Sequence, residues 1–150
     1  MSHSPAPWWP ALDLPWLWLI LSYLFGALPF AVWVGRRAGK DPRAGGSKNP
    51  GASNVARTSG FRWGLITLGL DALKGALIPS LILAGALISD TQLIDTQERL
   101  RWGFNLEEWA ALSGVFAVLG HITSPFLGFR GGRGVATALG VMFALHSGLA

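Results

Sequence analysis

The sequence of 150 residues is 51% hydrophobic and only 13% charged, whereas soluble domains carry about 25% charged residues. This composition excludes an ordinary water-soluble domain and indicates a protein embedded in lipid. Cysteine is absent, which excludes disulfides and thiolate chemistry, and the net charge of +4 comes from basic loops that report membrane topology, so nucleic acid is not an expected partner.

The first predicted transmembrane helix covers residues 16–34, which contain no charged side chain. These 19 residues would reach roughly 28 Å as a helix, close to the thickness of the hydrocarbon core. Pro29 predicts a kink, and the small residues Gly26 and Ala27 allow a neighbouring helix to come close. Residues 1–15 lack the basic start of a secretory signal, and we expect an irregular lead-in there.

The segment that follows, residues 35–62, is strongly basic. It contains seven Lys or Arg residues and a single acidic residue, Asp41. Positive charges concentrate in cytoplasmic loops of membrane proteins. The segment is therefore predicted to face the cytoplasm, which places the N-terminus outside.

Within this basic segment, residues 46–57 form a small, polar loop punctuated by glycine. Glycine lets backbone N–H groups approach a ligand closely, and the side chains add hydroxyl, amide and guanidinium donors, so the loop is equipped to bind phosphate. The same residue types are common in turns, and a flexible loop between helices explains the composition equally well. The candidate phosphate-binding residues are Ser47, Asn49, Gly51, Ser53, Asn54 and Arg57.

A second apolar run, residues 63–89, would be about 40 Å long as a helix and would exceed the hydrocarbon core. It contains Asp71 and Lys74, which are three residues apart and therefore share one helical face. A charge inside a membrane is costly, and an opposite charge on the same face makes it tolerable. We expect a supporting ion pair that either fixes helix packing or orients loop groups at the membrane surface.

The rest of the chain continues the alternation between the two sides of the membrane. Residues 90–108 contain five acidic and two basic residues, as expected of an outer loop. A third apolar run covers residues 109–129, and residues 134–150 begin a fourth helix that the chain ends within or just after. The predicted fold is an all-α integral membrane protein in which residues 1–150 form a single transmembrane bundle with three full spans and a fourth helix.

A second glycine-rich stretch follows the third run, where Gly131, Gly132 and Gly134 surround Arg133 just before the fourth helix. Helix N-termini offer unpaired N–H groups and partial positive charge, so this stretch is a second predicted anion site on the same side of the membrane. Alternatively, Arg133 only anchors the topology. The glycine spacing matches neither the Walker nor the dinucleotide pattern, which disfavours nucleotide binding.

His121 lies before this second stretch and is a candidate general base or phosphate donor. A lone His near a helix end is more often structural, so both interpretations stay open. The three His residues show no metal-ligand spacing, and no carboxylate cluster accompanies them. We therefore expect neither a metal nor another cofactor.

Three blocks of sequence carry a resemblance to a known family. They are Ser47-Lys48-Asn49-Pro50-Gly51-Ala52-Ser53-Asn54 with Arg57, then Leu70-Asp71 with Lys74-Gly75, then Gly120-His121 leading to Phe129 and Gly131-Gly132-Arg133-Gly134-Val135-Ala136-Thr137. In order and spacing they resemble the bacterial membrane acyl-phosphate:glycerol-3-phosphate acyltransferase family, from about residue 20 to the end. Two residues depart from the family pattern, because Lys48 replaces a usual Gly and Arg133 a usual Lys.

The resemblance implies transfer of a fatty acyl group from acyl phosphate to glycerol 3-phosphate, giving lysophosphatidic acid for phospholipid biosynthesis without coenzyme A. It implies that Ser47, Arg57 and Arg133 hold the glycerol 3-phosphate head. Ser53 and backbone N–H groups would lie nearer the acyl phosphate, and the proton would pass to His121 or to a substrate phosphate. The implied setting is the bacterial inner membrane, with both glycine-rich loops on the cytoplasmic face.

The family's third cytoplasmic motif and its last spans have no counterpart before Ala150, so we expect this chain to lack them. The alternative function is a small membrane anion transporter or channel subunit, and a third interpretation is a structural membrane anchor. Transport would place polar residues across the whole bilayer. Here they cluster toward the inner third, which favours the enzyme.

Overall fold

The computed structural model describes residues 15–87 and 103–148, in which every regular element is a helix. The predicted lead-in before Pro15 and most of the acidic outer loop lie outside the described residues. In chain order the elements are α1 (Pro15–Gly26), α2 (Phe30–Arg37), α3 (Ala52–Ser59), α4 (Phe61–Leu87), α6 (Leu106–Ile122), the short 3-10 helix η2 (Pro125–Leu127) and α7 (Val135–Gly148).

Three stretches of the described chain are long and apolar enough to cross a membrane, namely Trp16–Arg37, Phe61–Ala84 and Leu106–Leu127. The fourth helix, α7, contains a shorter apolar stretch, Val135–His146. The prediction of an all-α integral membrane protein with three full spans and a fourth helix is confirmed.

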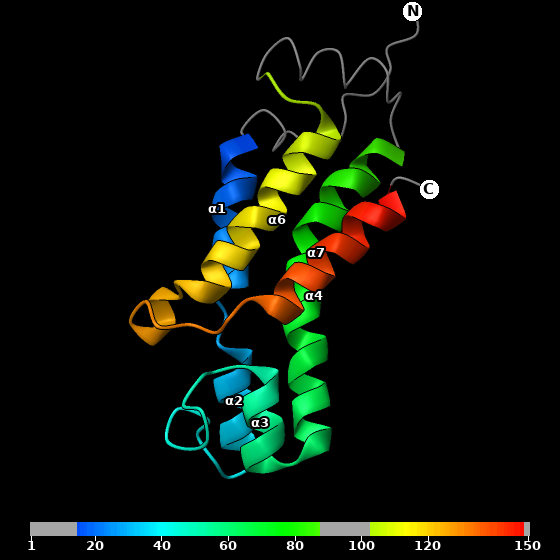
Figure 1. Cartoon of the computed structure of the whole chain (residues 1–150). Coiled ribbons are helices and arrows are strands. Elements are labelled where there is room, and N and C mark those ends of the chain that lie inside the picture. Colours follow the sequence, from blue (N-terminus) through cyan, green and yellow to red (C-terminus); the bar gives the residue numbers. More distant parts are fainter. Residues whose placement is uncertain (1–14, 88–102, 149–150) are drawn as a thin grey trace, which may run out of the picture.

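The helices form a bundle that is extended at one end (Figure 1). In that view α1, α6, α4 and α7 lie side by side, with α1 packed along α6 and α4 along α7. The long helix α4 continues past the bundle, and α2 and α3 pack against this extension. The loop that joins α6 to α7 lies at the same level as the junction between the bundle and α2 and α3, where the second glycine-rich stretch faces the first.

The first span is broken rather than merely kinked. α1 ends at Gly26 and α2 begins at Phe30, so the chain leaves the helical path just before and at Pro29. Pro29 has no N–H to donate and its ring excludes the preceding turn of a continuous helix. The break leaves backbone carbonyl groups without their usual helical partners, which is costly away from water.

Two side chains from other helices satisfy the carbonyl groups at this break. Ser124 Oγ donates to the carbonyl O of Ala27 at 2.6 Å, and Lys74 Nζ donates to the carbonyl O of Leu28 at 2.9 Å. Ser124 follows α6 and Lys74 belongs to α4, so the break ties three spans together. Both side chains are buried.

Glycine residues allow the two main helix pairs to approach closely. A Cβ at Gly26 or Gly120 would run into the backbone of the opposing helix in the α1–α6 pair. A Cβ at Gly75 would meet the backbone of Thr137, and one at Gly140 would meet the backbone of Ala72, in the α4–α7 pair. Small residues at such crossings are typical of membrane helices, where close packing replaces the hydrophobic effect.

The basic segment contains a helix, α3, that the sequence analysis does not predict. It begins after Gly51, whose extended backbone (φ −146°, ψ 164°) caps it, and ends at Ser59, before Gly60, which has a φ of +105°. Its side chain Val55 is fully buried against Ala31 and Val34 of α2. The prediction of a loop over residues 46–57 is therefore wrong from Ala52 onward, because the burial of Val55 stabilises a helix that is too short to form by itself.

Candidate active site

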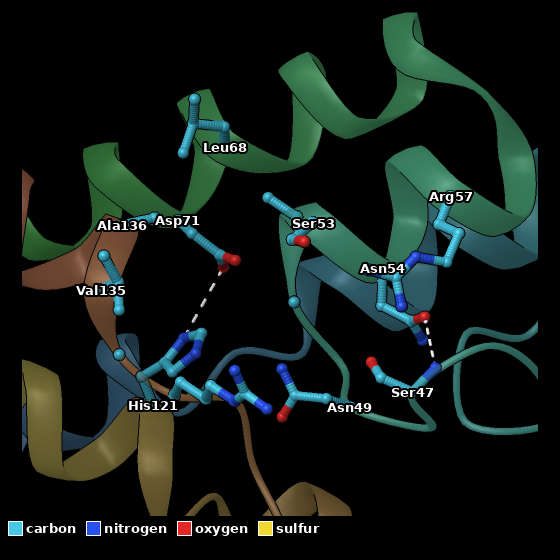
Figure 2. Close-up of a pocket in the computed structure, with 14 residues that line it drawn as sticks. Ser47, Asn49, Ser53, Asn54, Arg57, Leu68, Asp71, His121, Val135 and Ala136 are labelled. Atoms are coloured by element: carbon cyan, nitrogen blue, oxygen red, sulfur yellow. Dashed lines mark hydrogen bonds and ion pairs between the residues drawn. The ribbon is translucent and has the colours of Figure 1, made fainter.

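The two glycine-rich stretches line one pocket of about 360 Å³. Ser47, Asn49 and Arg57 line it from the first stretch, and Arg133 from the second. Figure 2 shows Ser47, Asn49 and Arg57 on one side of this space and His121 on the other. The volume falls at the lower end of the range for small-molecule sites, roughly 300–1,000 Å³. Residues far apart in the sequence thus meet in one site.

Asn54 organises the first stretch. Its side chain is buried, its Oδ1 accepts a hydrogen bond from Ser47 N at 2.9 Å, and its Nδ2 donates to Pro42 O at 2.6 Å and to Gly45 O at 3.1 Å. Gly46 leaves the space for this amide, because a Cβ there would collide with Asn54 Oδ1. The amide therefore fixes the backbone that presents Ser47 and Asn49 to the pocket.

Asp41 fixes the turn that precedes this stretch. Its Oδ1 accepts from Arg43 N and Nε, both at 3.0 Å, and its Oδ2 accepts from Arg43 Nη2 at 2.7 Å and from Arg36 Nε at 3.2 Å. The Arg43 guanidinium holds the pKa of the Asp41 carboxyl well below its usual range, with smaller help from Arg36. Arg36 and Arg43 therefore pair with Asp41 and stabilise the turn.

Arg57 and Arg133 provide the free positive charge of the pocket. Both side chains are exposed, and neither pairs with a carboxylate of any residue that the structure describes. Ser47 and Ser53 are exposed beside them, and their hydroxyl groups can donate to an anion. Two unpaired guanidinium groups with neighbouring hydroxyls form an arrangement suited to oxyanions, since guanidinium binds such groups in bidentate fashion.

Asp71 and Lys74 form an ion pair behind the cationic part of the pocket. Lys74 Nζ lies 3.0 Å from Asp71 Oδ1, and both side chains are buried in α4. Asp71 lines the pocket, whereas Lys74 lines a separate, much smaller cavity of about 10 Å³. A buried carboxylate next to a pocket needs a nearby cation, and Lys74 provides it.

His121 lies at the end of α6 and supports the second stretch. Its carbonyl O accepts from Gly132 N at 3.1 Å, and the next carbonyl, Ile122 O, accepts from Gly131 N at 2.9 Å. A Cβ on Gly132 would collide with His121 Nε2, and one on Gly131 would collide with the backbone of the same residue. The glycines therefore let the chain before Arg133 lie directly against His121.

The pocket also has an apolar side that the sequence analysis does not identify. Leu68 of α4 and Val135 and Ala136 of α7 line it, and Figure 2 shows them near Asp71, away from Ser47 and Arg57. Leu68 and Val135 are exposed. Two sequence signals point to it: Leu68 and Asp71 are three residues apart on one helical face, and Val135 and Ala136 stand in the third block of the resemblance.

Not every candidate residue lines this pocket. Gly51, Ser53 and Gly134 do, but Gly131 does not, and Gly132 lines the smaller cavity instead. Within residues 15–87 and 103–148, the structure contains no group of three or more His, Asp or Glu side chains placed to hold a metal ion.

Fold and site together define a class of protein: an integral membrane bundle with a cationic, hydroxyl-bearing pocket at one end and an apolar side on the same pocket. The sequence matches the family described as Glycerol-3-phosphate acyltransferase over residues 16–150, and the chain belongs to this family. The resemblance noted from the three sequence blocks is thereby confirmed.

Individual relatives agree with this assignment. The chain is 44% identical over 126 residues to the glycerol-3-phosphate acyltransferase of Desulfotalea psychrophila, covering 84% of this chain and 57% of the relative. It is 47% identical over 127 residues to glycerol-3-phosphate acyltransferase 1 of Deinococcus radiodurans, covering 85% and 55%. The chain thus spans a little over half the length of these curated relatives.

Two solved structures have a similar fold. One is PlsY (YgiH), described as an integral membrane glycerol 3-phosphate acyltransferase, in its glycerol 3-phosphate form, with 35% identity and a TM-score of 0.68 over 89% of this chain and 58% of that one. The other is the lysphosphatidic acid form of PlsY, with 34% identity and a TM-score of 0.67 over 89% and 57%.

Proposed function

We propose that this protein transfers a fatty acyl group from acyl phosphate to glycerol 3-phosphate and so makes lysophosphatidic acid. The family and the similar PlsY structures support the acceptor and the product, because their descriptions name glycerol 3-phosphate and lysphosphatidic acid. The acyl-phosphate donor is the finer part of the proposal and rests on the three sequence blocks and on the chemistry of the pocket.

The observation that carries the proposal is the meeting of Arg57 and Arg133 in one pocket at one end of an apolar bundle. Both proposed substrates carry phosphate, and one also carries a long acyl chain that must stay in lipid. The exposed apolar side at Leu68 and Val135 suits that chain, while the two guanidinium groups suit the phosphates. A pocket with both characters would let a water-soluble acceptor meet a lipid-soluble donor.

The reaction needs no nucleophile from the protein. The hydroxyl oxygen of glycerol 3-phosphate attacks the acyl carbonyl carbon, an ester C–O bond forms, the C–O bond to phosphate breaks, and inorganic phosphate leaves. The hydroxyl proton passes to His121 or to a phosphate oxygen of a substrate. Because acyl phosphate is already activated, holding the two substrates in line and stabilising the developing oxyanion can supply much of the rate.

The residues divide into binding and shaping roles. Ser47, Arg57 and Arg133 hold the glycerol 3-phosphate head, and Ser53 with nearby backbone N–H groups lies closer to the acyl phosphate. Asn54 shapes the first stretch, because its amide is already engaged with three backbone groups. The remaining proposed members of the site are Asn49 and Gly51 in the first stretch, Gly131, Gly132 and Gly134 in the second, and the supporting pair Asp71 and Lys74.

We place the protein in the bacterial inner membrane, with the pocket at the cytoplasmic face and the N-terminus outside. The basic segment between α2 and α4 supports this orientation under the positive-inside rule. Water-soluble glycerol 3-phosphate would then reach the pocket from the cytoplasm.

The test is an acyl-transfer assay in lipid nanodiscs with acyl phosphate and glycerol 3-phosphate. It is run on this chain and on a form extended past Ala150 with the corresponding part of the Deinococcus radiodurans relative. Arg57→Ala and Arg133→Ala should each lower kcat/KM by about 10- to 150-fold, the effect of a lost charge-assisted hydrogen bond of roughly 1.5–3 kcal/mol. Arg62→Ala is the matched control, because Arg62 does not line the pocket and lies over the Trp63 ring at 5.8 Å.

The outcomes separate the competing functions. Turnover that survives both pocket substitutions, or falls equally in Arg62→Ala, would refute the two-arginine site. Use of acyl-coenzyme A in place of acyl phosphate would refute the donor. Phosphate flux through liposomes without acyl transfer would favour the transporter alternative over the enzyme.

A further inference from the structure

A series of buried polar side chains, from Lys74 through Asp71 to His121, connects the break in the first span to the pocket. It starts at the break in the first span, where Lys74 Nζ donates to Leu28 O at 2.9 Å and lies 5.6 Å from the centre of the Phe30 ring. The same ammonium lies 3.0 Å from Asp71 Oδ1. Lys74 is thus held from two sides although it lies outside the pocket.

The series of polar side chains continues from Asp71 to His121 without a direct hydrogen bond. Asp71 Oδ1 and His121 Nδ1 are 3.8 Å apart, which is too far for a hydrogen bond. His121 Nδ1 is buried without a hydrogen-bond partner, whereas Asp71 Oδ1 faces Lys74 Nζ at 3.0 Å, and both residues line the cavity of about 10 Å³ that Lys74 also lines. The contact between the two side chains is therefore electrostatic, between the Asp71 carboxylate and the imidazole.

His121 connects this series of polar side chains to the second glycine-rich stretch. Gly132 N donates to His121 O, and Gly132 packs so closely on the imidazole that a Cβ would collide with Nε2. Arg133 follows directly in the sequence. A shift of the imidazole toward Gly132 would therefore push on the backbone just before Arg133.

We propose that Lys74 is a positioning residue for the anion site: anchored on Leu28 O, it holds Asp71, which contacts His121 Nδ1 at 3.8 Å and thereby fixes the stretch that presents Arg133. The consequence for phosphate affinity rests on the function proposed above, but the consequence for the order of residues 131–133 does not. Lys74 itself never touches the substrate.

The competing interpretation is an ion pair that only stabilises helix packing. The change in phosphate affinity on substitution separates an effect of charge from an effect of geometry. Asp71 places a negative charge beside the pocket, so its removal alone should strengthen phosphate binding if its charge were all that mattered. Removal of Asp71 together with Lys74 leaves the net charge of the site unchanged, so a loss of affinity would then report geometry.

The experiment uses the double variant Lys74→Met/Asp71→Leu, because replacing a buried ion pair by apolar residues is often neutral or stabilising. The readouts are Tm, amide hydrogen exchange at residues 131–133, and the Kd for sn-glycerol 3-phosphate and inorganic phosphate in nanodiscs. We expect an unchanged or higher Tm, with exchange at least about tenfold faster and Kd at least about tenfold weaker. If this variant does not fold, Lys74→Met/Asp71→Asn, which preserves both side-chain volumes, is measured in the same way.

The matched control is Ser22→Ala, which removes a buried hydrogen bond between spans, from Ser22 Oγ to Ser113 O at 2.6 Å, remote from the pocket. It should lower Tm and leave the exchange of residues 131–133 and the Kd unchanged. A folded double variant with protected amides and parental Kd would overturn the proposal. A third outcome is that the unsubstituted protein binds neither sn-glycerol 3-phosphate nor inorganic phosphate, while the double variant still shows faster exchange at residues 131–133. This outcome would support the positioning role and refute the proposed function.

Discussion

One added methyl group at the crossing of α4 and α7 should separate these helices. A Cβ on Gly140 would lie well inside van der Waals contact with the backbone O of Ala72, and one on Gly75 would do the same with Thr137. The obstructing atoms belong to helical backbone, which cannot rotate away as a flexible side chain can. Gly140→Ala therefore forces the axes apart by roughly 1 Å at this point.

The expected loss of stability follows from this overpacking, which typically costs about 1–3 kcal/mol. For a chain of 150 residues each kcal/mol corresponds to roughly 2–4 °C in Tm, so Gly140→Ala should lower Tm by roughly 2–12 °C. The two helices also carry Asp71 and Ala136 of the pocket wall. Their separation should weaken binding of glycerol 3-phosphate as well.

Thermal unfolding in detergent, followed by helical circular dichroism, measures the first effect. Gly69→Ala in α4 is the matched control, because its Cβ would meet no atom of another helix within 4 Å among the described residues. Alanine favours a helix over glycine by up to about 1 kcal/mol, so the control should leave Tm unchanged or raise it. Equal Tm values for Gly140→Ala and Gly69→Ala would refute the argument that backbone contact sets the helix spacing.

Two further predictions concern the basic segment. Lys48 has a φ of +57°, a left-handed conformation that costs a non-glycine residue roughly 1–2 kcal/mol. Glycine removes this strain but gives the unfolded chain more freedom, so Lys48→Gly should raise the free energy of unfolding by about 0.5–1 kcal/mol. An unchanged free energy of unfolding in a denaturant titration would show that Lys48 is not strained. The pKa of Asp41 is lowered in the folded protein, so its contribution to stability is present above its ordinary pKa of 3.8 and is lost as the pH falls through the lowered value. Unfolding measured from pH 7 to pH 3 should therefore show an advantage over Asp41→Asn that shrinks below about pH 4, and a constant difference would contradict the assignment.

The spans and the site could be predicted from the sequence because they depend on local composition. Long uncharged runs identify the helices, and the basic residues of 35–62 next to the acidic residues of 90–108 give the alternation that brings the two glycine-rich stretches together. Pro29 indicates the interruption of the first span for a similar reason, since the missing N–H is a property of that residue alone.

The rest depends on contacts between distant residues, which composition does not encode. Nothing near Asn54 in the sequence indicates that its amide binds Pro42 O and Gly45 O rather than a ligand. Likewise the short α3 depends on the burial of Val55 against Ala31 and Val34 of α2, a contact that its own eight residues do not reveal. The contacts of Lys74 with Leu28 O and of Ser124 with Ala27 O join residues that only the folded bundle brings together.

The interrupted first span has a consequence for biosynthesis. During synthesis this span enters the bilayer before α6 exists, and the carbonyl group of Ala27, which accepts from Ser124 in the folded protein, then lacks that partner. An unpaired carbonyl in hydrocarbon is costly, so the nascent segment must keep this point near headgroups or water. Its final depth can be reached only after the ribosome has passed Ser124, and insertion of the first span is therefore completed late.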